Sequence, residues 1–107
     1  DVIKVESPEG DLMRQWPPIL DGYSQYFASV NRNKRSVVLD LKSDAGRADA
    51  RRLARSADIL LENFRPGVMA KFGLDYATLA KAHPALVYCS VSAFGQTGPR
   101  AAEGGFG

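Results

Sequence analysis

Residues 36–63 read SVVLDLKSDAGRADARRLARSADILLEN, an apolar run, a capped helix and a second apolar run. Ser36–Leu41 is short, β-branched and bounded by polar residues, which predicts a buried strand. Ser43 is a candidate N-cap for a helix that runs to about Ser56, and Asp44 suits the positive end of that helix. Asp58–Asn63 is a second short apolar strand. A strand, a helix and a strand in this order predict parallel pairing.

The flanking segments continue the alternation of strands and helices. Before the central stretch, Asp1–Glu6 predicts a strand with Ile3 and Val5 on one face, and Tyr23–Val30 a short helix. After it come a short helix over Gly67–Lys71 with Pro66 at its first position and Gly73 at its end, a helix over Tyr76–Ala82 capped by Asp75, and a last strand over Leu86–Val91. We therefore expect an α/β fold, a parallel sheet with helices against it.

Two further segments have a clear local character. Ser7–Gly22 is so rich in proline and glycine that we expect a long irregular loop, and Asn31–Arg35 reads as a polar turn. Trp16, within that loop, is more typical of a packing anchor than of a substrate platform. On the central helix the spacing predicts an apolar stripe and an arginine face toward solvent. The stripe comprises Ala45, Ala48, Leu53, Ala54 and Ala57, and the arginines are Arg47, Arg51, Arg52 and Arg55.

Composition excludes several function classes. The chain has 107 residues, 45% hydrophobic and 24% charged, with a formal net charge of +2. This balance argues against a nucleic-acid partner, and the longest apolar runs are far below the roughly 20 residues of a membrane span. One cysteine and one histidine cannot supply a metal cluster, so we expect no metal and a reducing, cytoplasmic location. Cys89, in a predicted buried strand, reads as a small inert hydrophobe.

The ends of the chain carry a separate expectation. Asp1 already lies within a predicted strand, and residues 103–107 form a glycine-rich stretch with no capping element after it. A natural domain rarely opens inside a strand and closes inside such a loop. We therefore expect residues 1–107 to be an internal piece of a longer protein.

Candidate ligand-binding residues follow the predicted strands. In parallel α/β sheets, ligands sit at the carboxyl ends of the strands. These ends supply Lys42, then Asn63, Phe64 and Arg65, then Phe94 beside Gly95, with Lys71 about one turn into a helix. Cations and rings in these positions suit a ligand with an aromatic base and phosphates, although solvated loop residues would look the same. Dinucleotide and triphosphate glycine motifs are absent, and Ser90, Ser92 and His83 form no recognisable triad.

Six segments in order resemble the family III CoA-transferases, which include formyl-CoA transferase, carnitine CoA-transferase and the α-methylacyl-CoA racemases. The segments are Asp1–Glu6, Asn31–Ser36, Leu39–Lys42, Glu62–Gly67, Leu86–Tyr88 and Phe94–Pro99. The resemblance covers nearly the whole chain. Because family members are several times longer, it implies that residues 1–107 form part of the N-terminal large domain. The first strand and helix of that domain and all of the C-terminal part would then be lacking.

The resemblance implies a partial Rossmann-like sheet, an interlocked homodimer, and acyl-CoA and a carboxylic acid as substrates. It also assigns a CoA-binding role to residues at the strand ends. These residues are Leu39, Asp40, Leu41, Lys42, Asn63, Phe64, Arg65, Lys71, Ser92, Ala93, Phe94 and Gly95. Lys71 stands where many relatives carry arginine, so it keeps the positive charge without the bidentate fork.

The resemblance also implies a nucleophile. In the transferases of this family an aspartate attacks the acyl-CoA thioester, and in the racemases an aspartate and a histidine move the α-proton. That aspartate closes a Gly-aromatic-Asp triplet, and the matching triplet here is Gly105-Phe106-Gly107. Gly107 has no side chain with which to attack. Three explanations stay open: a shift of the alignment, a changed residue, or a catalytically inactive remnant that binds CoA or assembles with partners.

Overall fold

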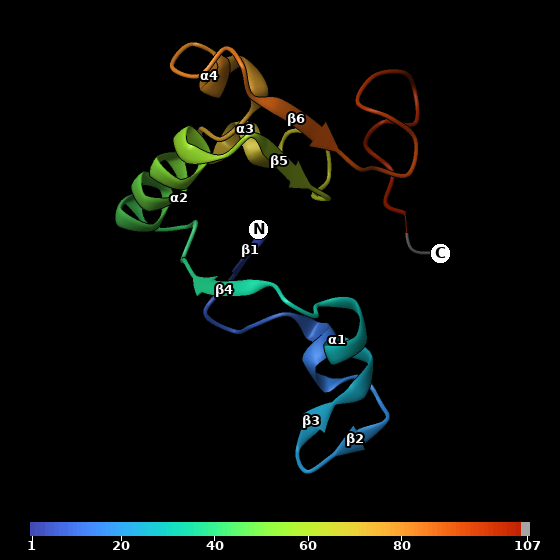
Figure 1. Ribbon diagram of the computed structural model, residues 1–107. Helices are drawn as coiled ribbons and strands as arrows, with labels where there is room; N and C mark the ends of the chain where they lie inside the picture. The colour runs from blue at the N-terminus through green and yellow to red at the C-terminus, as the bar shows by residue number, and fades with distance from the viewer. Residues whose placement is uncertain (106–107) are drawn as a thin grey trace. The chain divides into compact units, whose positions relative to one another are not determined.

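The computed structural model describes residues 1–105, which divide into two compact units, Asp1–Leu41 and a second unit that begins at Lys42. The first unit contains β1 (Ile3–Glu6), the 3-10 helix η1 (Leu12–Gln15), β2 (Ile19–Leu20), β3 (Tyr23–Ser24), α1 (Gln25–Val30) and β4 (Arg35–Val38). The second contains α2 (Asp44–Ser56), β5 (Ile59–Glu62), α3 (Val68–Lys71), α4 (Tyr76–Ala80) and β6 (Val87–Ser90), all traced in Figure 1. Each unit is described by itself.

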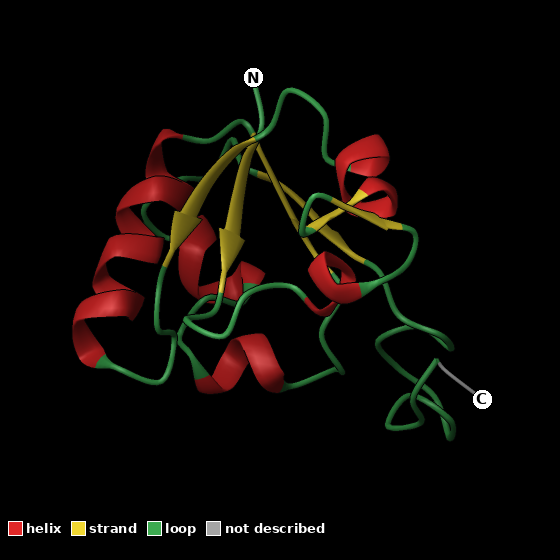
Figure 2. Cartoon of the chain, turned by 90° about the horizontal axis from the view of Figure 1, so that it is seen from below, coloured by secondary structure: helices red, strands yellow, loops and turns green. Residues whose placement is uncertain are grey.

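Each unit holds one parallel pair of strands, which confirms the α/β fold class. In the first unit β1 pairs with β4, so that Ile3 lies opposite Arg35 and Glu6 opposite Val38. In the second unit β5 pairs with β6, with Ile59 opposite Val87. Figure 2 shows these strands as yellow arrows and the helices in red. Helical connections between parallel strands are what the alternating sequence predicts.

The prediction of an irregular loop over Ser7–Gly22 is wrong, because this segment contains η1 and half of a hairpin. β2 and β3 pair antiparallel around a two-residue turn, Asp21-Gly22. Both turn residues have positive φ, 50° and 75°, the geometry of the tight hairpin turns whose twist matches that of the strands. Asp-Gly between apolar residues is the sequence signal for such a turn.

The first helix begins two residues later than predicted, at Gln25, because Ser24 is its N-cap. The Ser24 hydroxyl accepts a hydrogen bond from the Phe27 amide at 3.1 Å and donates one to the Trp16 carbonyl at 2.6 Å. Phe27 is buried and forms an edge-to-face contact with Tyr23. Ser24 therefore fixes both the start of α1 and the end of the loop that carries Trp16.

The second unit buries one face of its strand pair and leaves the other exposed. Leu60 and Tyr88 are half-buried, whereas Ile59 and Leu61 are 63% and 68% exposed. Cys89, on β6, is also exposed, so its predicted burial is wrong. Side chains alternate between the two faces of a strand, and nothing in residues 42–105 covers the second face. The expectation that these short apolar runs are buried strands fails for that reason.

The long helix α2 has the predicted bounds and cap but a different buried face. Ser43 accepts a hydrogen bond from the Gly46 amide at 3.0 Å. Gly46 and Ala54 are the buried residues, whereas Ala45 and Ala48 are exposed. Residues 46, 50, 53, 54 and 57 follow the helical repeat and make up this face. The predicted stripe is therefore right for its second half and wrong for Ala45 and Ala48.

Two short helices follow β5. Gly67 is the N-cap of α3 and has φ of 90°, a conformation that glycine adopts without strain, so Pro66 precedes the cap and does not occupy the first helical position as predicted. Asp75 is at the N-cap of α4 as predicted, but its carboxylate accepts a hydrogen bond from the Thr78 hydroxyl at 2.6 Å and none from a backbone amide.

Along residues 1–105, no helix has the length and apolarity of a membrane span.

Candidate functional site

Three of the predicted site residues directly follow β4. The Leu39 amide donates to the Glu6 carbonyl at 3.0 Å, which extends the parallel ladder past the end of the strand. Leu39 and Leu41 are half-buried and Asp40 is exposed. These residues close the first unit, and Lys42 opens the second. The structure thus places Leu39–Leu41 at the carboxyl end of β4, where the sequence predicts them. The other candidate residues belong to the second unit.

The predicted residues after β5 are held by a local turn. The Glu62 carboxylate accepts the Phe64 amide at 2.8 Å, so the chain folds back directly after the strand. The Phe64 ring packs edge-to-face against Phe72, with 6.3 Å between centroids. Asn63 and Phe64 remain exposed. An exposed ring with a fixed orientation can stack on a flat aromatic ligand.

Lys71, the last residue of α3, is exposed. Its backbone amide donates to the Gly67 carbonyl at 3.2 Å, which holds the residue in the helix. The ammonium group sits at the end of a flexible stem, so it can meet a phosphate only as a point charge.

The structure brings the last described residues back to the ends of β5 and β6. Nη2 of Arg65 lies 3.1 Å from the position that a Cβ on Gly104 would take. A Cβ on Gly105 would lie 3.2 Å from Cβ of Ala93. Glycine at 104 and 105 therefore permits a close approach to two predicted site residues. Gly107, the expected position of the nucleophile, lies outside the described residues.

The segment after β6 is stabilised by contacts that the sequence did not predict. The Arg100 guanidinium lies over the Phe94 ring, with 3.7 Å from Cζ to the centroid. The Gln96 side chain donates to the Ser92 hydroxyl at 3.3 Å. Gly95 has φ of 85°, a left-handed conformation that glycine permits. Phe94 thus presents one face to a cation.

A cavity of about 290 Å³ lies beside these segments, in the second unit. Arg65, Gly67, Ser90 and Gln96 are among its lining residues, together with the Tyr88 ring. The Tyr88 hydroxyl donates to the Leu74 carbonyl at 2.8 Å. Burial, with smaller contributions from nearby carboxylates, raises the pKa of Tyr88 to about 12. Tyr88 therefore stays protonated at neutral pH and serves as a structural support.

At the end of β1, Glu6 is buried and fully bonded. It is only 6% exposed, and its carboxylate accepts hydrogen bonds from the Arg14 guanidinium, the Asp11 amide and the Ser36 hydroxyl. Hydrogen bonds lower the pKa of Glu6 to about 2, and the bond from Arg14 has the largest effect, followed by those from Asp11 and Ser36. Together they outweigh burial, which raises the pKa. Sequence analysis identified Glu6 only as a strand end. Glu6 holds the segment that follows β1 against the strand pair.

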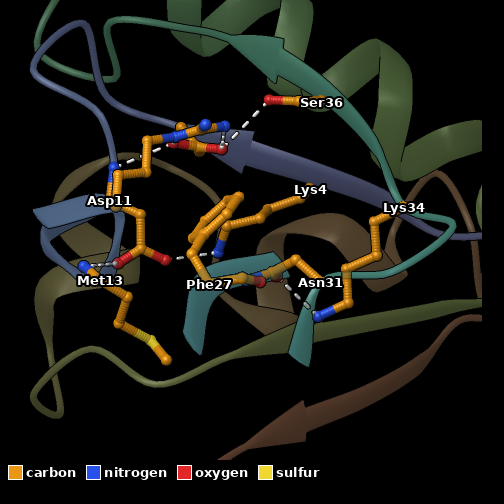
Figure 3. Close-up of polar contacts among 9 residues, drawn as sticks. Lys4, Asp11, Met13, Phe27, Asn31, Lys34 and Ser36 are labelled. Carbon is orange, nitrogen blue, oxygen red and sulfur yellow. Dashed lines mark hydrogen bonds and ion pairs between the residues drawn. The ribbon is translucent and has the colours of Figure 1, made fainter. Parts of the chain in front are cut away.

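Asp11 adds a second ion pair to this cluster, drawn in Figure 3. Its carboxylate binds Lys4 at 2.8 Å and accepts the Met13 amide at 2.9 Å. The bond to Lys4 is the largest reason that the pKa of Asp11 is lowered. Lys4 and Glu6 are both on β1, so the strand holds the start of η1 at two points. This cluster organises the first unit, and the lowered pKa values of Glu6 and Asp11 keep both carboxylates ionised at neutral pH.

Across residues 1–105, no group of three or more histidine, cysteine, aspartate and glutamate side chains could hold a metal ion.

Comparison with known proteins identifies clear relatives. The model of the family described as CoA-transferase family III matches residues 1–107. A succinate--glutarate CoA-transferase of Agrobacterium fabrum is 48% identical over 99% of this chain and 28% of its own length. An acetyl-CoA:oxalate CoA-transferase of Acetobacter aceti is 51% identical over 92% of this chain and 26% of its own length. The chain thus spans about a quarter of the length of these curated relatives.

A solved structure shows the same fold. The crystal structure of a CAIB/BAIF family protein from Brucella suis superposes with a TM-score of 0.92 at 47% identity. The match covers 99% of this chain and 29% of that one. Such a score over nearly every residue means that the strand order and the helical connections described above also occur in that protein.

Proposed function

The chain belongs to CoA-transferase family III, and on that premise we propose that the protein moves CoA from an acyl-CoA thioester to a carboxylic acid. The observation that carries the proposal is the return of Gly104 and Gly105 to Arg65 and Ala93. This return supports a location of the reaction beside the carboxyl ends of the strands. Ligands of parallel α/β sheets bind at this edge.

The coenzyme would bind along the strand ends. Lys42, Arg65 and Lys71 would supply positive charge to its phosphates, and Arg65 alone offers a bidentate fork. The exposed rings of Phe64 and Phe94 would stack on the adenine. The remaining residues of the proposed site would line its path with backbone groups and small side chains. They are Leu39, Asp40, Leu41, Asn63, Ser92, Ala93 and Gly95.

The acceptor would be a dicarboxylic acid. The names of the relatives mention succinate and glutarate in one case and oxalate in another, and further relatives are named for mesaconate and D-citramalate. Each of these acids carries two carboxylates. One carboxylate would receive CoA while the second would need a cationic or hydrogen-bonding partner in the protein.

The remaining properties of the whole protein are also proposals. Residues 1–107 would form part of a Rossmann-like large domain, without its first strand and helix and without the C-terminal part. Two copies would interlock as a homodimer in the cytoplasm. The bare face with Ile59, Leu61 and Cys89 supports the first of these proposals, because the sheets of parallel α/β domains are covered on both faces.

Gly107 favours a second candidate function. A glycine can neither attack a thioester nor carry a proton, so a protein with glycine at the catalytic position would bind CoA or assemble with partners without turnover. The two candidates differ in one measurable property. Only the transferase predicts formation of a new acyl-CoA, whereas the second candidate predicts either CoA binding without turnover or assembly with partners alone.

The test is a transfer assay on the intact protein. Succinyl-CoA or acetyl-CoA is incubated with glutarate, oxalate or mesaconate, and the acyl-CoA products are separated by mass. A new acyl-CoA that depends on the protein supports the transferase. CoA binding without any product supports the non-catalytic candidate. Absence of both binding and transfer overturns the proposal, and exchange of an α-proton with solvent in place of transfer indicates a racemase.

A further inference from the structure

A basic pocket of about 130 Å³ lies between α2 and α4, within the second unit. Its lining comprises Arg51, Ala54, Arg55, Thr78, Leu79, Ala82 and His83. Two arginines and a histidine thus line a small hollow, and none of the lining residues carries a carboxylate. We propose that this pocket binds a small oxyanion, namely a phosphate group, at a place separate from the coenzyme site.

The arginines of α2 divide into two pairs. Arg47 pairs with Asp44 and Arg52 with Asp49, each three residues earlier on the helix. Arg51 and Arg55, one helical turn apart, share the face toward the pocket. Within residues 1–105 neither forms an ion pair. The charges of Arg51 and Arg55 are therefore available to a ligand.

Contacts around the pocket position its basic groups. Nη1 of Arg51 lies 3.5 Å from where a Cβ on Gly73 would stand, so the guanidinium packs over the turn before α4. Nε2 of His83 lies 2.7 Å from the Ala57 carbonyl, to which it donates. Ala57 is the C-cap of α2, so this bond satisfies a carbonyl at the partly negative end of the helix. Without it, that carbonyl would repel an anion held by Arg55.

The chemistry of the lining fits phosphate. Guanidinium groups donate two parallel N–H bonds to phosphate oxygens, and two such groups one turn apart can share a tetrahedral anion. The pocket of about 130 Å³ has room for more than one water, and a small oxyanion would displace them. The apolar part of the lining, Ala54, Leu79 and Ala82, limits the pocket to the phosphate group, so that the organic part of a monoester would lie outside it.

The pocket lies at the opposite edge of the strand pair from the proposed coenzyme site. α2 ends at Ser56, just before β5 begins at Ile59, and His83 precedes the start of β6 at Val87. Asn63 and Ser92, in contrast, follow the ends of the same two strands. The phosphate group would therefore be that of free phosphate or of a phosphate monoester other than the bound coenzyme.

The test measures phosphate binding to the intact protein by isothermal titration calorimetry in a chloride buffer. Arg51→Gln and Arg55→Gln should each weaken inorganic phosphate binding by at least about fivefold, as expected for loss of a charged hydrogen bond. Arg52→Gln is the matched control, because Arg52 is on the same helix and pairs with Asp49. Phosphate binding to this variant should be unchanged. Thermal melts of the three variants verify that each is folded.

Two further titrations distinguish the sources of the phosphate. With the coenzyme site filled by saturating CoA, adenosine 5′-monophosphate that binds more tightly than inorganic phosphate indicates a monoester, and equal or weaker binding indicates free phosphate. Saturating CoA should leave phosphate binding intact. Competition by CoA, equal losses in all three arginine variants, or no phosphate binding at all would each overturn the proposal.

Discussion

Arg14 holds Glu6 in a two-point ion pair, with Nη2 2.7 Å from Oε1 and Nε 2.9 Å from Oε2. The same guanidinium lies over the Phe27 ring, 4.1 Å from its centroid. One side chain thus joins the end of β1 to α1. Glu6 is buried and Arg14 is partly exposed, so the carboxylate depends on its partners for its charge. We therefore expect Glu6 to contribute more to the stability of the first unit than its other polar residues do.

We expect Glu6→Gln to lower the free energy of unfolding by about 1–3 kcal/mol, since an amide at this buried position loses the charge that pairs with Arg14 and cannot accept all of the hydrogen bonds that the carboxylate accepts. Urea denaturation of the intact protein measures this loss. Glu103→Gln is the control, because Glu103 forms a comparable ion pair with Arg100 at an exposed position. Its effect should stay below about 1 kcal/mol. Equal losses in both variants would contradict the role of burial.

The pKa of Glu6 predicts loss of stability in acid. The folded pKa is about 2 and the ordinary value is 4.5, so the folded state favours the ionised carboxylate. This contribution is present above pH 4.5 and disappears as the pH falls toward 2, with a total on the order of 3 kcal/mol. The measurement compares urea midpoints at pH 7 and pH 3 for the native protein and Glu6→Gln. The difference between the two proteins should shrink at pH 3, and a constant difference would disprove the assignment.

Arg65→Gln should weaken CoA binding by about tenfold, because it removes a charged hydrogen bond to a phosphate. Calorimetric titration of CoA into the intact protein measures the change. Arg52→Gln, outside the proposed site, should bind CoA as the native protein does. Unchanged affinity in Arg65→Gln would remove Arg65 from the coenzyme site.

Gly104→Ala should reduce CoA affinity with little loss of stability. The added Cβ would lie 3.1 Å from Nη2 of Arg65, and the end of a flexible side chain can move away. The displaced guanidinium would then lose its contact with phosphate. A double-mutant cycle checks this mechanism, since Gly104→Ala should have almost no further effect in the Arg65→Gln variant. Additive effects would mean that Gly104 acts through something other than Arg65.

Residues 1–107 produced alone should self-associate and show no transfer activity. The apolar face with Ile59, Leu61 and Val87 is exposed, and exposed apolar strands favour association. Size-exclusion chromatography with light scattering measures the association, and Leu61→Gln should reduce it. A monomer with a sharp, cooperative melt would contradict the structural part of this prediction. Measurable acyl transfer would contradict the catalytic part.

The sequence by itself determined the elements whose signals lie within a few residues of one another. Ser43 and the bounds of α2 were predictable because an N-cap acts on amides two or three residues ahead. Parallel pairing followed from strands separated by helices, and the family followed from six ordered segments. Asp21-Gly22 carried a hairpin signal of the same local kind.

The tertiary structure alone decided which side chains meet and which faces are covered. Arg65 and Gly104 lie far apart in the chain, as do Arg51 and His83, and their approach depends on how the intervening elements pack. Cys89 and Leu61 have the composition of a buried strand but are exposed, because burial depends on whether another segment packs on that face. Glu6 is the converse case, a carboxylate buried because Arg14, Asp11 and Ser36 all converge on it. Local sequence cannot specify such contacts, since each requires closure of a loop whose path the packing of the fold determines.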